Sequence, residues 1–217
     1  LLGGDLMNRI CKKLLLITIS ILLVISVTAC GSKESNQPAG DNDSSNNSQE
    51  MSQVVGLEGP IAKQPALLTS IGQSADVEMV KALMDNAGIQ YNLDKLVKSD
   101  EIGNEKTLVL AVGGSSKGLG AAGINADDEL KRLEALLDAA KDKNMTIIVV
   151  HVGGENRRGD LSDKFIVPAA KKADYIIVVE EGNKDGLFTK IASENKIPLD
   201  SVTNIADVLE PLKNAFE

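Results

Sequence analysis

From residue 65 onward, short and largely apolar runs alternate with longer amphipathic stretches. The apolar runs at 66–71, 107–112, 146–152 and 175–179 have the length of strands. Continuous apolar runs are typical of strands that are covered on both faces of a parallel sheet. The segment 89–93 alternates between apolar and polar residues, which predicts a more exposed strand.

Between these runs, apolar residues recur at helical spacing. Ser74 is a typical helix N-cap, either Asn125 or Asp127 can cap the next helix, and Gly88 is a typical helix stop. The expected helices run from Ser74 to 87, from Asn125 or Asp127 to 140, and over 160–172, 187–194 and 206–216, with a short edge segment at 198–205. Strands joined by helical crossovers predict a doubly wound α/β fold. We expect a mainly parallel sheet of five strands in the order 2-1-3-4-5, with helices on both faces.

Residues 1–30 have the features of a secretory signal. Basic residues within 9–13 precede an apolar run at 14–27, which is shorter than the ~20 residues of a membrane-spanning helix. The ending Val27-Thr28-Ala29-Cys30 resembles the lipobox of bacterial lipoproteins, which implies that Cys30 is diacylated. Met7, directly before the basic residues, is the expected start of translation. An uncleaved helical anchor is the alternative.

Residues 31–60 are rich in Ser, Asn, Asp, Gln and Gly, which predicts a disordered tether. The expected organisation is therefore a signal at 1–30, a tether at 31–60 and one α/β domain at 61–217. Two acyl chains on Cys30 would hold the protein stably at a membrane. We expect the domain to lie outside the cytoplasm.

The composition of the chain disfavours several classes of partner and of binding site. The net charge of −8 disfavours nucleic acid as a partner, and the 2% aromatic content disfavours sites built from stacked rings. Once Cys11 has left with the signal and Cys30 carries lipid, no thiol remains for a disulfide or a thiolate metal site. The acidic residues match no metal-binding pattern. We therefore predict no metal and no cofactor.

Glycine-rich loops follow three successive strands, at 113–118, 153–159 and 182–186. Each combines glycine, small polar residues and a cation, and each would lie at the carboxyl edge of the sheet beside the loop at 72–74. Helix N-termini there would add backbone donors, so we predict a small anionic ligand. The predicted binding residues are Gln73, Ser74, Gly113, Gly114, Ser115, Ser116, Lys117, Gly153, Gly154, Arg157, Arg158, Asn183 and Lys184. The alternative is that glycine only shapes the turns and the cations are solvated.

The letters G-x-G-x-x-G occur at 118–123 but do not predict a nucleotide site. In a dinucleotide fold the first glycine follows the strand directly, whereas Gly118 comes well after the strand end at Val112. The phosphate-loop pattern also fails, because Leu119 follows Gly118 where a lysine is required.

His151, the only histidine, lies in an apolar strand just before a glycine-rich loop. Such a residue is more often packed in a core than used in chemistry. The alternative function is an exported hydrolase or transferase that uses His151, Glu155 and Ser115 or Ser116, although no G-x-S-x-G motif is present.

The motifs VGGSSKGLGAAG, HVGGENRRGDLSD and EEGNKDGLF resemble an uncharacterised family of exported bacterial proteins, domain of unknown function 6305, over about Pro65 to Phe216. The resemblance implies no activity and supplies no catalytic residues. The first hypothesis is a membrane-anchored lipoprotein that binds a small anion. The second is the enzyme above, and the third is a protein-interaction module with a broad exposed apolar patch, so a protein partner remains an option.

Overall fold

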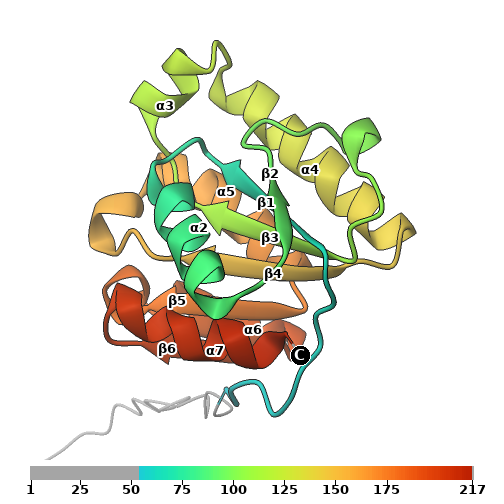
Figure 1. Cartoon of the computed structure of the whole chain (residues 1–217). Coiled ribbons are helices and arrows are strands. Elements are labelled where there is room, and N and C mark those ends of the chain that lie inside the picture. Colours follow the sequence, from blue (N-terminus) through green and yellow to red (C-terminus); the bar gives the residue numbers. More distant parts are fainter. Residues whose placement is uncertain (1–53, 217) are drawn as a thin grey trace, which may run out of the picture. The chain divides into compact units, whose positions relative to one another are not determined.

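The computed structural model describes residues 54–216, in which one sheet of six parallel strands has the order β2-β1-β3-β4-β5-β6 (Figure 1). The strands are β1 (Ala66–Ile71), β2 (Tyr91–Leu93), β3 (Thr107–Val112), β4 (Thr146–His151), β5 (Tyr175–Val179) and β6 (Leu199–Val202). The α/β class and the order of the first five strands are confirmed. The count of five strands is wrong, because the expected edge segment pairs with β5 as a sixth strand.

Helices connect the strands close to the expected positions. They are α2 (Asp76–Ala87), α3 (Ser116–Ala121), α4 (Ala126–Asp142), α5 (Asp160–Lys172), α6 (Leu187–Asn195) and α7 (Leu209–Ala215). Short 3₁₀ helices are η1 (Ser99–Glu101), η2 (Glu155–Arg157), η3 (Glu180–Asn183) and η4 (Ile205–Val208). The sequence analysis missed α3, which forms inside the predicted loop because the Ser115 hydroxyl accepts a hydrogen bond from the Gly118 N–H at 3.1 Å.

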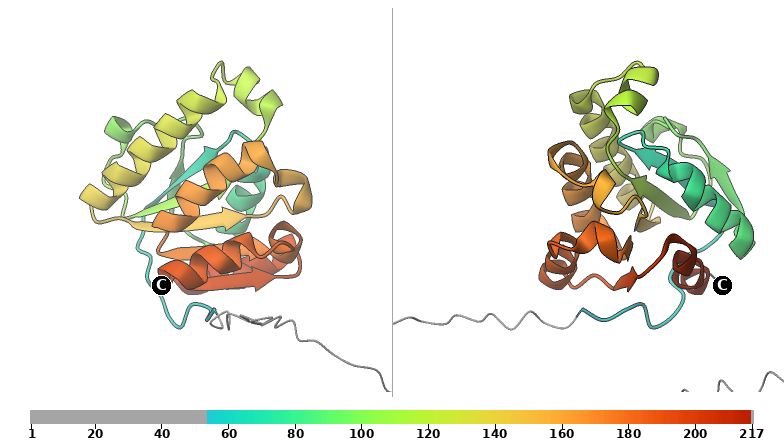
Figure 2. Two further views of the ribbon diagram at one scale, coloured as in Figure 1. Left: turned by 180° about the vertical axis from the view of Figure 1, so that it is seen from behind. Right: turned by 90° about the vertical axis from the view of Figure 1, so that its left-hand side faces the viewer.

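The sheet is buried on both faces, as the apolar strands predicted. Leu108, Leu110 and Val112 of β3 pack with α4, α5 and α6, whereas Val109 and Ala111 face α2 and α7. Figure 2 shows these two helical layers on opposite sides of the sheet. Because the sheet and both cores lie within 54–216, this segment contains the contacts that it needs to fold by itself.

Residues 54–62, here called the strap, begin against the edge strand β6 and continue to the end of α7. The Val55 carbonyl accepts from the Leu199 N–H at 3.2 Å, and the Leu57 N–H donates to the Asp200 carboxylate at 3.2 Å. Farther along, the Ala62 N–H donates to the Ala215 carbonyl at 2.8 Å. The last part of the predicted tether, 54–60, is therefore packed against the domain.

The predicted signal, Cys30 and residues 31–53 of the tether lie outside the described residues. Within 54–216, no helix has both the length and the hydropathy that crossing a membrane requires.

Candidate functional site

The carboxyl ends of the strands gather the predicted loops on one edge of the sheet. In Figure 1 the turns after β3, β4 and β5 lie together on the left, on the side of α3. The loop after β1 joins them, because Gln73 forms a β-bridge with Gly114. The border between β1 and β3 is the point where the strand order reverses, which is where open α/β sheets bind ligands.

At this border, Asp76 and Arg157 form an ion pair. Arg157 Nε donates to Asp76 Oδ1 at 3.4 Å, which is a long hydrogen bond. The Asp76 side chain is 5% exposed, and its second oxygen, Oδ2, has no hydrogen-bond partner. A buried acceptor without a partner costs about 1–3 kcal/mol, so this atom is a candidate contact for a ligand.

Arg157 is the outer member of the pair. Its side chain is 34% exposed, and among the described residues neither terminal guanidinium nitrogen has a hydrogen-bond partner. A guanidinium presents its donors as a planar fork that fits carboxylate and phosphate groups. The outward nitrogens are thus available to an anionic group from solvent.

Gly153 and Gly113 make room for this pair. A Cβ at residue 153 would lie 2.0 Å from Arg157 Cγ and 2.4 Å from Asp76 Oδ2. A Cβ at residue 113 would lie 2.8 Å from the same oxygen. Both predicted glycines therefore contact the pair directly, and their role is close approach.

The loop after β1 is fixed by a buried network on α4. Glu129 Oε1 accepts from the Gly72 N–H at 2.7 Å and from Gln73 Nε2 at 3.0 Å. Arg132 Nε in turn donates to Glu129 Oε2 at 2.8 Å. Gln73, a predicted ligand contact, is thus used to hold the loop in place. Sequence reasoning missed Glu129 and Arg132, because a Glu three residues before an Arg resembles an ordinary helix-surface pair.

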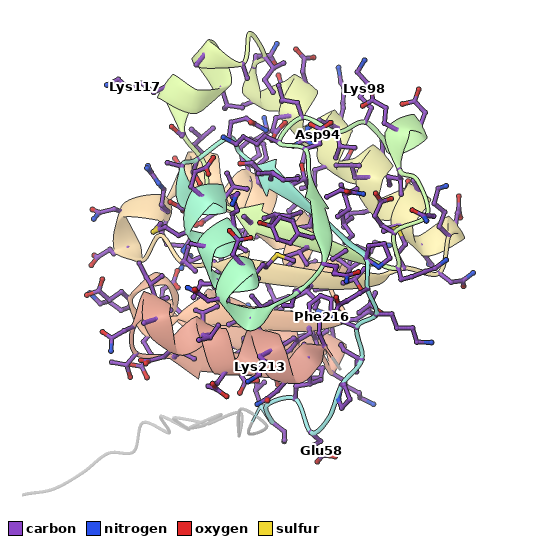
Figure 3. All side chains as sticks on the ribbon, in the orientation of Figure 1. Glu58, Asp94, Lys98, Lys117, Lys213 and Phe216 are labelled. Carbon is purple, nitrogen blue, oxygen red and sulfur yellow. The ribbon has the colours of Figure 1, made fainter. Side chains whose placement is uncertain are left out.

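The predicted serines separate into different environments. Ser74 is buried beside Asp76, and its Oγ accepts from the Asp76 N–H at 3.3 Å. Ser115 caps α3, whereas Ser116 is exposed. Lys117 extends outward from α3, away from the sheet edge (Figure 3).

The loop glycine Gly114 is buried, and its N–H donates to Ser162 Oγ at 2.9 Å. Asn183 caps α6, because its Oδ1 accepts from the Phe188 N–H at 2.9 Å. Gly154 carries a positive φ of 59° at the turn before η2. These predicted residues therefore shape the loops.

The predicted convergence of Lys117, Arg157, Arg158 and Lys184 on one anion stays a prediction, and the structure pairs two of these cations, Arg158 and Lys184, with carboxylates. Arg158 is paired with Asp163 and Asp185, each at 2.8 Å, and also donates to the Gly182 carbonyl. Its hydrogen bond to Asp185 raises the pKa of the Arg158 guanidinium further above its usual value.

Lys184 pairs with Glu155 at 2.8 Å, and their hydrogen bond raises the pKa of Lys184 and lowers the pKa of Glu155. Carboxylates on neighbouring turns therefore neutralise Arg158 and Lys184. Arg157 differs from them, because it lies at the sheet edge and its terminal guanidinium nitrogens have no partner among the described residues.

His151 is fully buried, and the residues of the alternative enzyme hypothesis, His151, Glu155 and a serine, are not hydrogen-bonded to one another. His151 Nδ1 lies 2.9 Å from the Val112 carbonyl oxygen and Nε2 lies 3.3 Å from the Gly154 carbonyl oxygen. Glu155, by contrast, is paired at the surface, with a side chain that is 72% exposed. Among the described serines, none has a hydroxyl that is hydrogen-bonded to His151. Within residues 54–216, no cluster of three or more His, Cys, Asp or Glu side chains is placed to hold a metal ion.

The burial of His151 predicts a pH dependence of stability. Desolvation lowers the pKa of the ring below 6.5, although the two carbonyls oppose this. Below about pH 6.5, His151 therefore binds a proton more readily in the unfolded chain than in the folded chain. The free energy of unfolding thus falls as the pH drops below about 6.5. Thermal unfolding of the domain should show a lower Tm at about pH 5.5 than at about pH 7.5, with a slope of at most about 1.4 kcal/mol per pH unit.

The control for that slope is His151→Gln, which removes the only imidazole of the chain. The variant is expected to be less stable at every pH, since it disturbs a packed site. Its Tm should nevertheless change less than that of the native domain between these two pH values. A slope that persists unchanged in His151→Gln would contradict the assignment.

A cavity of about 710 Å³ lies at the opposite, amino edge of the sheet. Helices α4, α5 and α6 end there, and Lys141, Lys171 and Lys172 line it. Cations near helix C-termini balance the negative end of the helix dipole, which explains these lysines without a ligand. Two smaller cavities, of about 510 and 180 Å³, adjoin the strap, and no predicted site residue lines any of the three.

Comparison with known proteins supports the family resemblance. The family model described as Domain of unknown function (DUF6305) matches residues 63–216. No curated protein matches the chain. The structure of a GDSL-like lipase from Bacteroides thetaiotaomicron is 12% identical, with 67% of this chain and 72% of that chain covered and a TM-score of 0.31. AlinE4, an SGNH-hydrolase family esterase, is 9% identical, with 71% and 81% covered and a TM-score of 0.28.

Proposed function

We propose a function for this chain, which belongs to the family described as Domain of unknown function (DUF6305), from the geometry of the Asp76–Arg157 ion pair. The protein is a membrane-anchored lipoprotein whose domain lies outside the cytoplasm. This domain binds a small ligand with an anionic group at the carboxyl edge of its sheet. Arg157 holds that group, and Asp76, Ser74 and the backbone at Gly113 and Gly153 form the inner wall.

The observation that carries this proposal is that the terminal guanidinium nitrogens of Arg157 are unpaired among the described residues. The residue is held by one long hydrogen bond at 3.4 Å, and its terminal nitrogens have no partner among the described residues. Arg158 and Lys184 are already neutralised by carboxylates, and Lys117 points away. The site therefore depends on one guanidinium and is smaller than the sequence predicted.

The sequence supports the anchoring part of the proposal. A basic start, an apolar run and a lipobox-like ending at Cys30 are followed by polar residues up to the strap. A flexible segment of the length of 31–53 has an end-to-end distance of roughly 25–30 Å. This distance would keep the sheet edge clear of the lipid headgroups and open to solutes.

The geometry gives less support to the other two hypotheses. A hydrolase or transferase would need His151 within reach of a serine, but the ring is 0% exposed and faces two carbonyl oxygens. For an interaction module, few large apolar side chains are exposed among the described residues: Val55 and Ile61 lie on the strap, and Leu96 and Ile205 lie on two other segments.

The test compares Arg157→Gln with the matched control Lys117→Gln in the domain 54–217. Each variant loses one cation, but only the first loses the proposed anion contact. In thermal-shift and calorimetric titrations with acetate, propionate, phosphate and the standard amino acids, Arg157→Gln should weaken binding by about tenfold or more. Lys117→Gln should leave it unchanged.

Arg157→Lys adds a second check, because it keeps a charge near Asp76 but lacks the fork. It should also weaken binding, and circular dichroism of the free variants shows whether the fold is retained. Equal affinity in the native domain and Arg157→Gln would rule out this site, as would equal losses in Arg157→Gln and Lys117→Gln.

A further inference from the structure

We propose that the ligand is an α-amino acid in its zwitterionic form, with its carboxylate on Arg157 and its ammonium on Asp76. This inference rests on the proposed function and names the chemical class of the ligand. It starts from Asp76 Oδ2, a buried acceptor that Arg157 does not satisfy. A simple anion offers no donor for this oxygen, whereas an ammonium group offers three.

The position of Oδ2 explains how one ligand can reach both residues. A Cβ placed on Gly153 would lie 2.4 Å from this oxygen and 2.0 Å from Arg157 Cγ. The two atoms are therefore neighbours above the same glycine, and the oxygen is buried. Rotation of the Arg157 side chain toward solvent uncovers Oδ2 and carries the guanidinium outward.

The present contact between the two side chains is weak enough to be exchanged. It consists of a single hydrogen bond at 3.4 Å, and the terminal nitrogens of Arg157 are not engaged. Asp76, in contrast, is fixed in the first turn of α2, where its backbone N–H also contacts Ser74 Oγ. The zwitterion therefore replaces one long ion pair with two shorter charge-assisted contacts, one at each end.

Charge balance also favours a neutral ligand over a simple anion. Asp76 and Arg157 cancel one another, Glu155 balances Lys184, and Arg158 faces two carboxylates, Asp163 and Asp185. A simple anion would leave one uncompensated negative charge next to a carboxylate that is 5% exposed. A zwitterion adds no net charge to the site, and because the stem of Arg157 fills the space above Gly153, the ligand enters as that side chain rotates outward.

The experiment titrates the domain 54–217 with the standard amino acids by calorimetry at neutral pH. Each amino acid that binds is then compared with its des-amino carboxylate, for example alanine with propionate. This comparison needs no variant, so it does not depend on whether a mutant folds. The amino acid should bind about tenfold or more tightly than its des-amino counterpart.

Asp76→Asn, which keeps the shape of the side chain, tests the assignment to this residue. The variant should lose most of the preference for the amino acid while its affinity for the des-amino carboxylate is unchanged or higher. Lys117→Gln should retain the preference of the native domain. Equal affinity for the two compounds in the native domain overturns the zwitterion but leaves anion binding in place. If neither amino acids nor simple anions bind, both the inference and the proposed function fail.

Discussion

Arg132→Met is expected to lower the free energy of unfolding by about 3–5 kcal/mol. Arg132 is the cation of a buried pair, and its partner Glu129 is 0% exposed. Methionine keeps the apolar stem but leaves the Glu129 carboxylate buried without its counter-charge. The same carboxylate accepts from Gly72 and Gln73, so the loop after β1 should also lose its support.

The control is Lys131→Met, the same kind of change at the preceding position of α4. Lys131 is 77% exposed and lies 4.0 Å from Asp128, so its loss should change stability by less than about 0.5 kcal/mol. Urea unfolding of the domain measures both variants. Losses of similar size would mean that the Glu129–Arg132 pair contributes no more than a surface pair.

Gly118→Ala is expected to destabilise the domain by about 1–3 kcal/mol through steric overlap. A Cβ at this position would lie 1.8 Å from the backbone oxygen of Gln73, so the backbone of one of the two loops must move. The close approach of α3 to the loop after β1 therefore depends on this glycine. The altered Gln73 position should also be visible as faster amide exchange in this loop.

Gly120→Ala, in the same short helix, should have the opposite sign. A Cβ there meets nothing within 4 Å, and alanine in a helix is favoured over glycine by roughly 0.5–1 kcal/mol. Paired denaturation curves of the two variants therefore separate packing from helix propensity. A change of the same sign in both would contradict the close approach at Gly118.

Most of the fold could be predicted because its strands are buried on both faces. Runs such as 107–112 then become continuously apolar, and the pattern is strong enough to give the strand order with general rules for crossovers. Two elements were predicted less well for local reasons. The strand β6 is short and half exposed, so it was expected as an edge segment but not counted in the sheet, and α3 was missed because its glycine and small residues favour a loop.

The candidate site was predicted less completely, because charge pairing depends on distances between loops. Arg158 and Lys184 were correctly placed at the carboxyl edge, but the sequence does not reveal that Asp185 and Glu155 lie within 2.8 Å of them. Asp76 stands two residues after the predicted N-cap Ser74, where acidic residues are common at helix starts, so its position does not mark it as a site residue. Its burial beside Gly113 and Gly153 follows from the packing of three loops that are distant in sequence.

The strap has a mechanical consequence for a protein held at its N-terminal side. Tension that enters at Val54 meets the hydrogen bonds of Val55 and Leu57 to β6 before it reaches β1. Asp200, which holds Leu57, also accepts from the Tyr175 hydroxyl, so part of the load passes into β5. If the chain is pulled from its N-terminal side, the hydrogen bonds of the strap bear the load first, and the first turn of α2, which carries Asp76, is shielded from it.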